Sequence, residues 1–106
     1  MLTNQLPLMD AVTLRALADP LRARIVELLA GEQLCTCHLV DETGATQTNL
    51  SNHLRVLREA GLIASEPAGR YTYHRLVPDR LDDVGTRLAD LAARARLAET
   101  AKRPCG

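Results

Sequence analysis

The segment TQTNLSNHLRVLREAG, residues 46–61, restricts the fold of this chain more than any other. Leu50, Leu54 and Leu57 recur at steps of three and four, which predicts a helix with one apolar side. A threonine at the start suits an N-cap, and a glycine at the end suits a helix stop. The opposite side carries threonine, asparagine and serine, which are poor helix formers. This polar side is therefore unusual for a surface that only meets solvent.

Three shorter helices are expected before and beside this one. Residues 8–30 are predicted to form the first two, and in the second of them Asp19 and Pro20 suit the N-terminus while Gly31 suits the end. Residues 35–43 predict a third short helix. A tight turn would then join it to the polar-faced helix.

The C-terminal half changes character after residue 61. Residues 62–76 predict a β-hairpin, because a Pro/Gly turn separates two short segments and the second alternates from residue to residue. Residues 78–98 predict the longest helix, with leucine, valine and alanine at helical spacing along one side. Such an apolar seam can pair with a copy of itself. Residues 99–106 are expected to form a flexible tail.

This order of elements is the pattern of a winged helix-turn-helix. Residues 35–60 supply the helix-turn-helix, and the hairpin of residues 62–76 supplies a wing with an arginine at its tip. We expect a single domain over residues 1–106, mainly α with a small β-hairpin, that forms a homodimer through its terminal helices. A hydrophobic content of 46% without Phe or Trp favours packed helices and a modest core.

The polar side of residues 46–61 suits double-stranded DNA, although the net charge of zero gives no support by itself. Asn and Gln can bond adenine through two hydrogen bonds, Arg can bond guanine, and Ser or Thr can approach bases or phosphates. Few aromatic residues argue against single-stranded nucleic acid. For His53, as for His74, packing is the more ordinary role. The candidate DNA-binding residues are Gln47, Thr48, Asn49, Ser51, Asn52, His53, Arg55, Arg70 and Tyr71.

Two of the three cysteines lie close together in QLCTCHLV, residues 33–40, and the third is Cys105. An odd count argues against a disulfide framework and leaves metal binding, redox sensing or burial. On a regular helix, side chains two positions apart diverge by about 200°, so Cys35 and Cys37 could hold one atom only at an irregular or unwound helix start. A disulfide across one residue is likewise unfavourable. With no well-placed histidine in the sequence, a low-coordinate metalloid fits better than zinc.

Four segments in order, LADPLRARIVELL, QLCTCHLV, TQTNLSNHLRVLREAGLI and GRYTYHRL, together resemble the ArsR/SmtB family of bacterial repressors, and within it the arsenite sensors. The resemblance implies a homodimer that binds double-stranded operator DNA without a cofactor. It also implies release when As(III) or Sb(III) binds Cys35 and Cys37, and control of an arsenic-resistance operon. Val40 stands where enteric sensors have a third cysteine, which leaves Cys105 as an open candidate for the third ligand.

Two alternatives with the same fold remain open. Cys35 and Cys37, or Cys37 and Cys105, could oxidise and form a thiol-based redox switch. The domain could also bind a protein without touching DNA. An enzyme is not expected, because no Cys-x-x-Cys and no Ser/His/Asp set is found. No stretch approaches the ~18 apolar residues that span a bilayer, so we expect a cytoplasmic protein with no membrane partner.

Overall fold

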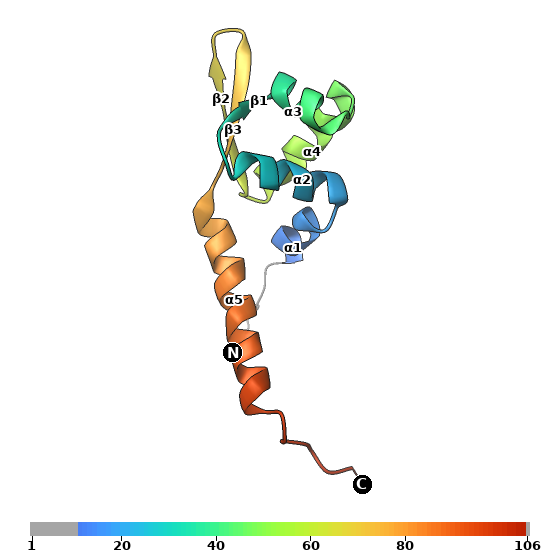
Figure 1. Cartoon of the computed structure of the whole chain (residues 1–106), viewed down its shortest axis with the longest axis vertical. Coiled ribbons are helices and arrows are strands. Elements are labelled where there is room, and N and C mark those ends of the chain that lie inside the picture. The colour runs from blue at the N-terminus through green and yellow to red at the C-terminus, as the bar shows by residue number, and fades with distance from the viewer. Residues whose placement is uncertain (1–10, 106) are drawn as a thin grey trace.

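The computed structural model describes residues 11–105. The elements in chain order are α1 (Ala11–Leu17), α2 (Pro20–Leu29), β1 (Leu34–Cys35), α3 (Thr36–Thr43), α4 (Gln47–Glu59), β2 (Ile63–Ala68), β3 (Tyr71–Leu76) and α5 (Pro78–Leu97). Figure 1 shows α1 to α4 gathered beside the strands, while α5 extends away from them. The predicted architecture, mainly helical with a small β-structure, is confirmed. The expected start of the first helix at residue 8 lies outside the described residues.

The two best-marked helices begin where their capping residues predict. The Asp19 carboxylate accepts hydrogen bonds from the backbone N–H groups of Leu21 and Arg22, at 2.9 and 3.0 Å, and Pro20 opens α2. The hydrogen bond from the Arg22 N–H is the main reason that the pKa of Asp19 lies below its usual value. At α4, the Thr46 hydroxyl accepts from the Asn49 N–H at 3.1 Å. The caps expected at Asp19 and Thr46 are therefore present.

The β-structure is larger than the predicted hairpin. β2 and β3 form that hairpin, and β1 pairs with the free edge of β3, which gives an antiparallel sheet of order β1-β3-β2. In β1, Leu34 pairs with His74 and Cys35 pairs with Tyr73. Two residues are too short to show the alternation that marks a strand, so the sequence pattern missed β1. As a result, Cys35 is attached to the sheet directly before α3 begins.

The core lies where α4 packs against the other helices and the sheet. Leu50, Leu54 and Leu57 are all buried, as the helical pattern predicted. They meet buried residues of α2, of α3, and of the segment that leads into β2 and begins it, which include Ile25, Leu29, Leu39, Leu62 and Ile63. Burying one side of α4 in this way leaves its polar side facing outward. The core therefore fixes the orientation of the side chains that the sequence suggests for DNA.

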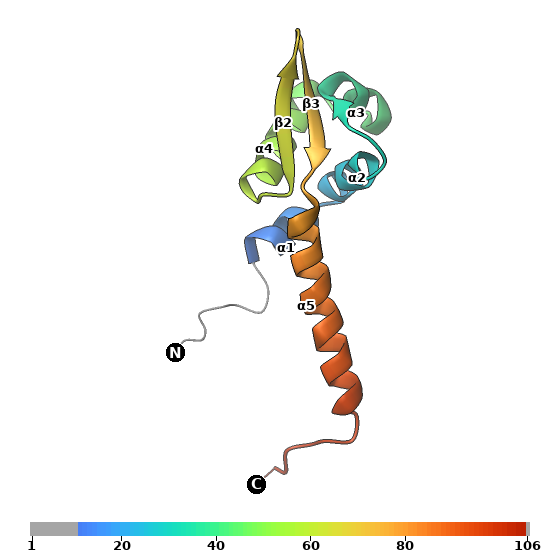
Figure 2. The same ribbon diagram turned by 90° about the vertical axis from the view of Figure 1, so that its left-hand side faces the viewer.

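The long helix α5 contributes little to this core. It contacts α1 near its start, and both views show it leaving the end of the sheet opposite the hairpin turn (Figures 1 and 2). Within the chain, Val84 is its only buried residue, whereas Leu88 is 49% exposed and Leu97 is 88% exposed. None of the helices within residues 11–105 has the length and apolar content to span a membrane. The apolar positions of α5 are thus left to a partner surface.

Candidate metal centre and nucleic-acid interface

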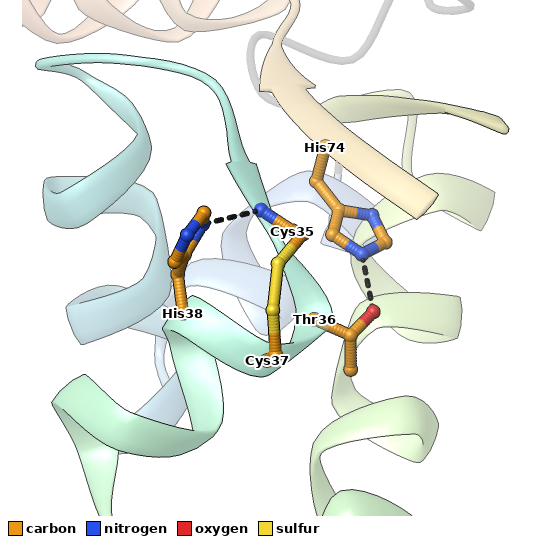
Figure 3. The surroundings of a disulfide bond; sticks show 5 residues. All are labelled: Cys35, Thr36, Cys37, His38 and His74. Carbon is orange, nitrogen blue, oxygen red and sulfur yellow. Dashed lines mark hydrogen bonds between the residues drawn. A yellow bond between two sulfur atoms is a disulfide. The ribbon is translucent and has the colours of Figure 1, made fainter. Parts of the chain in front are cut away.

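Cys35 and Cys37 meet at the start of α3. Cys35 is the N-cap residue with an extended backbone, φ −82° and ψ 166°, whereas Cys37 lies in the first helical turn. Their Cα atoms are 5.4 Å apart and a disulfide bond joins them (Figure 3). The sequence made this pair an awkward disulfide couple, and the structure nevertheless joins the two sulfur atoms. The irregular helix start, one of the two ways that the sequence allowed, brings the two sulfur atoms together.

His38 belongs to the same cluster and was missed from the sequence. Its Nδ1 accepts a hydrogen bond from the Cys35 N–H at 3.1 Å (Figure 3). The ligand atoms of Cys35, Cys37 and His38 all lie within 4.8 Å of one another. The statement that no histidine is well placed is therefore wrong. The sequence does show His38 directly after Cys37 and three residues after Cys35. This spacing brings the three side chains together only because Cys35 is the N-cap residue of α3.

This cluster suits a soft ion of low coordination number. Once the disulfide is reduced, it offers two thiolates and one imidazole, and thiolates favour thiophilic metals and metalloids. Cys35 is 2% exposed, but Cys37 and His38 are open to solvent. Within residues 11–105, no fourth cysteine, histidine or carboxylate joins the cluster. The tail that carries Cys105 follows α5 at the other end of the molecule (Figure 1), so a single chain does not bring this thiol to the site.

A hollow of about 210 Å³ connects the cysteine pair with the outward-facing part of the molecule. Its lining comes from the start of α3, the start of α4 and the turn of the hairpin, and comprises Cys35, Thr36, Cys37, Val40, Gln47, Arg70, Tyr71 and Thr72. His38 instead lines a separate hollow with the acidic residues Glu32, Asp41 and Glu42. The two cysteines therefore share a space with three of the predicted DNA-binding residues, Gln47, Arg70 and Tyr71.

The polar side of α4 is exposed along its length. The residues that the sequence predicted for DNA and that lie on this exposed side are Gln47, Thr48, Asn49, Ser51, Asn52 and Arg55. Arg70 and Tyr71 are also exposed, at the turn of the hairpin, and Tyr71 is 53% exposed. None of these eight residues is acidic. The arrangement presents hydrogen-bonding side chains on a helix beside an arginine on a wing, which is the geometry of a DNA reader.

His53 differs from the other predicted DNA-binding residues. It is half-buried and turned toward the start of α2, where its Nδ1 lies 3.0 Å from Arg22 Nη1 and 3.9 Å from Asp19 Oδ2. The arginine can only donate, so the histidine nitrogen accepts this hydrogen bond. His53 thus links α4 to α2, in agreement with the packing role that the sequence favoured.

His74 is buried in the sheet, 2% exposed, and both of its ring nitrogens meet hydroxyl groups. Nε2 lies 2.9 Å from Thr36 Oγ1 and Nδ1 lies 2.7 Å from Ser65 Oγ. Burial is the main cause that lowers the pKa of His74, and the nearby charge of Arg58 lowers it further. The ring is therefore neutral near pH 7. The packing role expected for His74 is confirmed, and its partners are polar.

The order of elements, the exposed polar side of α4 and the hairpin wing define the class: a winged helix-turn-helix DNA-binding regulator. The family model described as "Bacterial regulatory protein, arsR family" matches residues 19–65. The chain belongs to this family of transcriptional regulators, and it is not an enzyme.

Two relatives with established names match about two thirds of the chain. It is 39% identical over 64% of its length to the arsenic resistance transcriptional regulator ArsR1 of Pseudomonas putida. It is 41% identical over 64% of its length to the HTH-type transcriptional repressor SmtB of Mycobacterium tuberculosis. The matches cover 54% and 50% of these proteins, so the chain spans about half the length of each.

Solved structures extend the similarity over most of the chain. The crystal structure of a "possible transcriptional regulator for arsenical resistance" matches with a TM-score of 0.71 and 31% identity, over 89% of this chain and 100% of that one. The homodimeric winged helix-turn-helix DNA-binding domain of Mb0332 from Mycobacterium bovis matches with a TM-score of 0.65 and 25% identity, over 89% and 86% of the two chains. These matches support the winged helix-turn-helix fold across the described residues.

Proposed function

We propose that this protein is a repressor that binds double-stranded operator DNA as a homodimer and is released when As(III) or Sb(III) binds Cys35 and Cys37. The hollow that the cysteine pair shares with Gln47 and the hairpin turn is the observation that carries this proposal. A ligand held by the two thiolates would lie beside the first turn of α4 and beside the wing. Inducer binding and DNA binding would therefore act on the same part of the molecule.

On the DNA side, the exposed face of α4 enters the major groove. Gln47, Asn49 and Asn52 supply amide groups that can recognise adenine, and Arg55 can bond guanine or a phosphate. Arg70 at the wing binds the phosphate backbone and sets the register. The exposed leucines of α5 pair with those of a second chain, and the two copies of α4 then meet an operator with inverted half-sites.

On the ligand side, the number of donors favours As(III) or Sb(III) over zinc. Zinc in structural sites takes four ligands, whereas Cys35, Cys37 and His38 supply three. A trivalent metalloid is satisfied by two or three soft donors. The third position falls to His38, or to Cys105 delivered by a second chain. DNA binding itself requires no cofactor.

Release of DNA follows if the metalloid binds the DNA-free conformation of the protein more tightly than the DNA-bound conformation. Cys35 is buried at the end of β1 and Cys37 lies in the first turn of α3, so holding one atom between them constrains the start of this helix. A changed start of α3 moves α4, because the two helices pack against each other in the helix-turn-helix. A coupling of about 1–3 kcal/mol between the two ligands suffices to regulate occupancy of the operator.

A competition assay tests this proposal. Reduced protein is bound to a labelled inverted-repeat operator and titrated with arsenite, antimonite, cadmium and zinc in parallel. Arsenite and antimonite should release the DNA, while Cys35→Ser and Cys37→Ser should remain bound. Cys105→Ser is the matched control and separates the tail thiol from the site. Normal release from the Cys35→Ser protein would refute the assigned ligand site.

The disulfide between Cys35 and Cys37 favours a second candidate, a thiol-based redox repressor of the same fold. Two thiols and one molecule of hydrogen peroxide would yield the disulfide and two molecules of water. Release of the operator by peroxide, together with full retention in arsenite plus a thiol-free reductant, would select this function over metalloid sensing.

A further inference from the structure

We propose that His74 is a positioning residue that transmits changes at the cysteine site to α4. The path is a chain of four hydrogen-bonded side chains, which are Thr36, His74, Ser65 and Arg58. The proposal deepens the proposed function and rests on it for the identity of the two coupled sites. It adds a route that runs through the sheet, apart from the direct packing of α3 on α4.

The chain of four side chains joins four elements. Thr36 opens α3 and stands between the two cysteines, and its Oγ1 lies 2.9 Å from His74 Nε2 on β3 (Figure 3). The other ring nitrogen of His74 lies 2.7 Å from Ser65 Oγ on β2. Arg58, in the last turn of α4, donates from Nη1 to the same Ser65 oxygen at 3.4 Å. One continuous path thus runs from the cysteine pair to the DNA-facing helix.

Arg58 can only donate, so Ser65 Oγ accepts from it and keeps its own hydrogen free for a second bond. We assign that hydrogen to His74 Nδ1, which places the hydrogen of the neutral ring on Nε2 and directs it to Thr36 Oγ1. In this assignment the hydrogens along the path all point the same way. Each group is satisfied by the next, so a change at one end alters the bond at every step.

The path borders a hollow of about 320 Å³ between α4 and the sheet, lined by Thr36, Ser51, Leu54, Arg58, Ser65, Thr72 and His74. Beside this hollow, the hydrogen bonds of the four side chains connect α3, the sheet and α4. Rearranging the sulfur atoms around a bound atom displaces Thr36, and buried His74 has little access to water that could replace the lost bond.

The test measures coupling, defined as the ratio of the operator Kd with arsenite to the operator Kd without it. Thr36→Val, Ser65→Ala and His74→Leu should each lower this ratio, by about fivefold for the loss of one link. Thr36→Val combined with Ser65→Ala should lower it no further than either change alone, since one break interrupts the path. His74→Gln, which can still offer an amide N–H near the position of Nε2, should retain part of the coupling.

Thr43→Val is the matched control. Thr43 lies at the other end of α3, where its hydroxyl donates to the Leu39 carbonyl at 2.7 Å and accepts from the Ala45 N–H at 3.2 Å. Its loss therefore disturbs the same helix and its turn without touching the four side chains of the path. We call the path through Thr36, His74, Ser65 and Arg58 the relay. If His74 has only a structural role, the relay variants and Thr43→Val should lower the urea midpoint by the same amount, and the coupling should be unchanged in all of them. That result, with wild-type release by arsenite intact, would overturn the relay and leave the proposed function standing.

A second readout does not depend on arsenite. In reduced protein carrying Cys105→Ser, the rate of alkylation of Cys35 and Cys37 by N-ethylmaleimide is measured with and without operator DNA. The relay predicts that DNA changes this rate in the parent and that His74→Leu removes most of the change. If the change persists in His74→Leu, DNA merely covers the thiols and the relay is wrong. If the effect of DNA on the alkylation rate disappears in His74→Leu while arsenite never releases DNA, arsenite is not the inducer and the relay stands.

Discussion

Replacing Arg22 of α2 tests whether this side chain helps to hold α4 in place through His53. The guanidinium of Arg22 donates from Nε to the Ala16 carbonyl at 2.7 Å and from Nη2 to the Arg15 carbonyl at 3.2 Å, which closes the end of α1. Nη1 reaches His53 of α4 at 3.0 Å. One residue of α2 therefore ties α1 and α4 together. Its three hydrogen bonds connect α2 with the end of α1 and with α4.

The expected loss in the free energy of unfolding follows from the hydrogen-bond partners of Arg22. A hydrogen bond from a charged donor contributes about 1.5–3 kcal/mol, and the bond to the Ala16 carbonyl is the best shielded because Ala16 is 1% exposed. The other two bonds are more open to water and count for less. Arg22→Met keeps most of the apolar stem and should lower the free energy of unfolding by about 2–3 kcal/mol. Lysine lacks the planar guanidinium with its several N–H donors, so Arg22→Lys should lower the free energy of unfolding by about half as much as Arg22→Met.

Urea unfolding at one fixed protein concentration measures the loss, since a dimer's stability depends on concentration. Arg24 is the matched control on the same helix, because it only approaches Glu27 at 3.9 Å with both side chains largely exposed. Arg24→Met should change stability by less than about 0.5 kcal/mol. Equal losses for Arg22→Met and Arg24→Met would refute the argument that Arg22 fastens α4.

Four further predictions concern His74, two candidate DNA-binding residues and the exposed side of α5. Burial and the charge of Arg58 lower the pKa of His74, so on acidification the unfolded chain binds a proton before the folded protein does. The contribution of neutral His74 to stability is therefore present above pH 6.5 and lost as the pH falls below it. Urea titrations at several pH values should show this loss in the wild type and a flatter profile in His74→Gln. Arg70→Ala should make the fall of log K with log salt less steep by about 1.8, because the homodimer loses two phosphate contacts of about 0.9 each, whereas Asn49→Ala should weaken binding by about 1–3 kcal/mol at one preferred base pair of each half-site, both measured by fluorescence anisotropy. Leu88→Asp should yield monomers in sedimentation equilibrium, because Leu88 is 49% exposed in the single chain and a charge on the apolar seam opposes pairing.

The parts of the fold that could be predicted from the sequence are those with a repeating pattern or a marked end. The leucines of α4 repeat at helical spacing, and Asp19 and Thr46 carry the cap chemistry, so the helices and their starts follow from local physics. The hairpin follows from its turn and alternation. These same features orient the polar side of α4, which is why most of the candidate DNA-binding residues are exposed as the pattern predicted.

The parts that could not be predicted depend on contacts between distant segments. β1 is two residues long and exists because Leu34 and Cys35 pair with β3, far along the chain. That pairing holds Cys35 extended, which in turn lets Cys37 and His38 converge on it. No spacing rule for a regular helix describes this arrangement. The partners of His74 come from α3 and β2 in the same way, so its role in the sheet also required the structure.

The central claim is that one small site, Cys35 with Cys37, controls whether α4 stays on DNA. The most direct measurement is the anisotropy of a labelled operator during an arsenite titration of reduced protein, with Cys105→Ser as the parent and Cys37→Ser added to it. The parent should release the operator at a stoichiometry of one arsenite per chain, and the Cys37→Ser protein should hold it throughout. Release from both proteins at the same arsenite concentration would contradict the account.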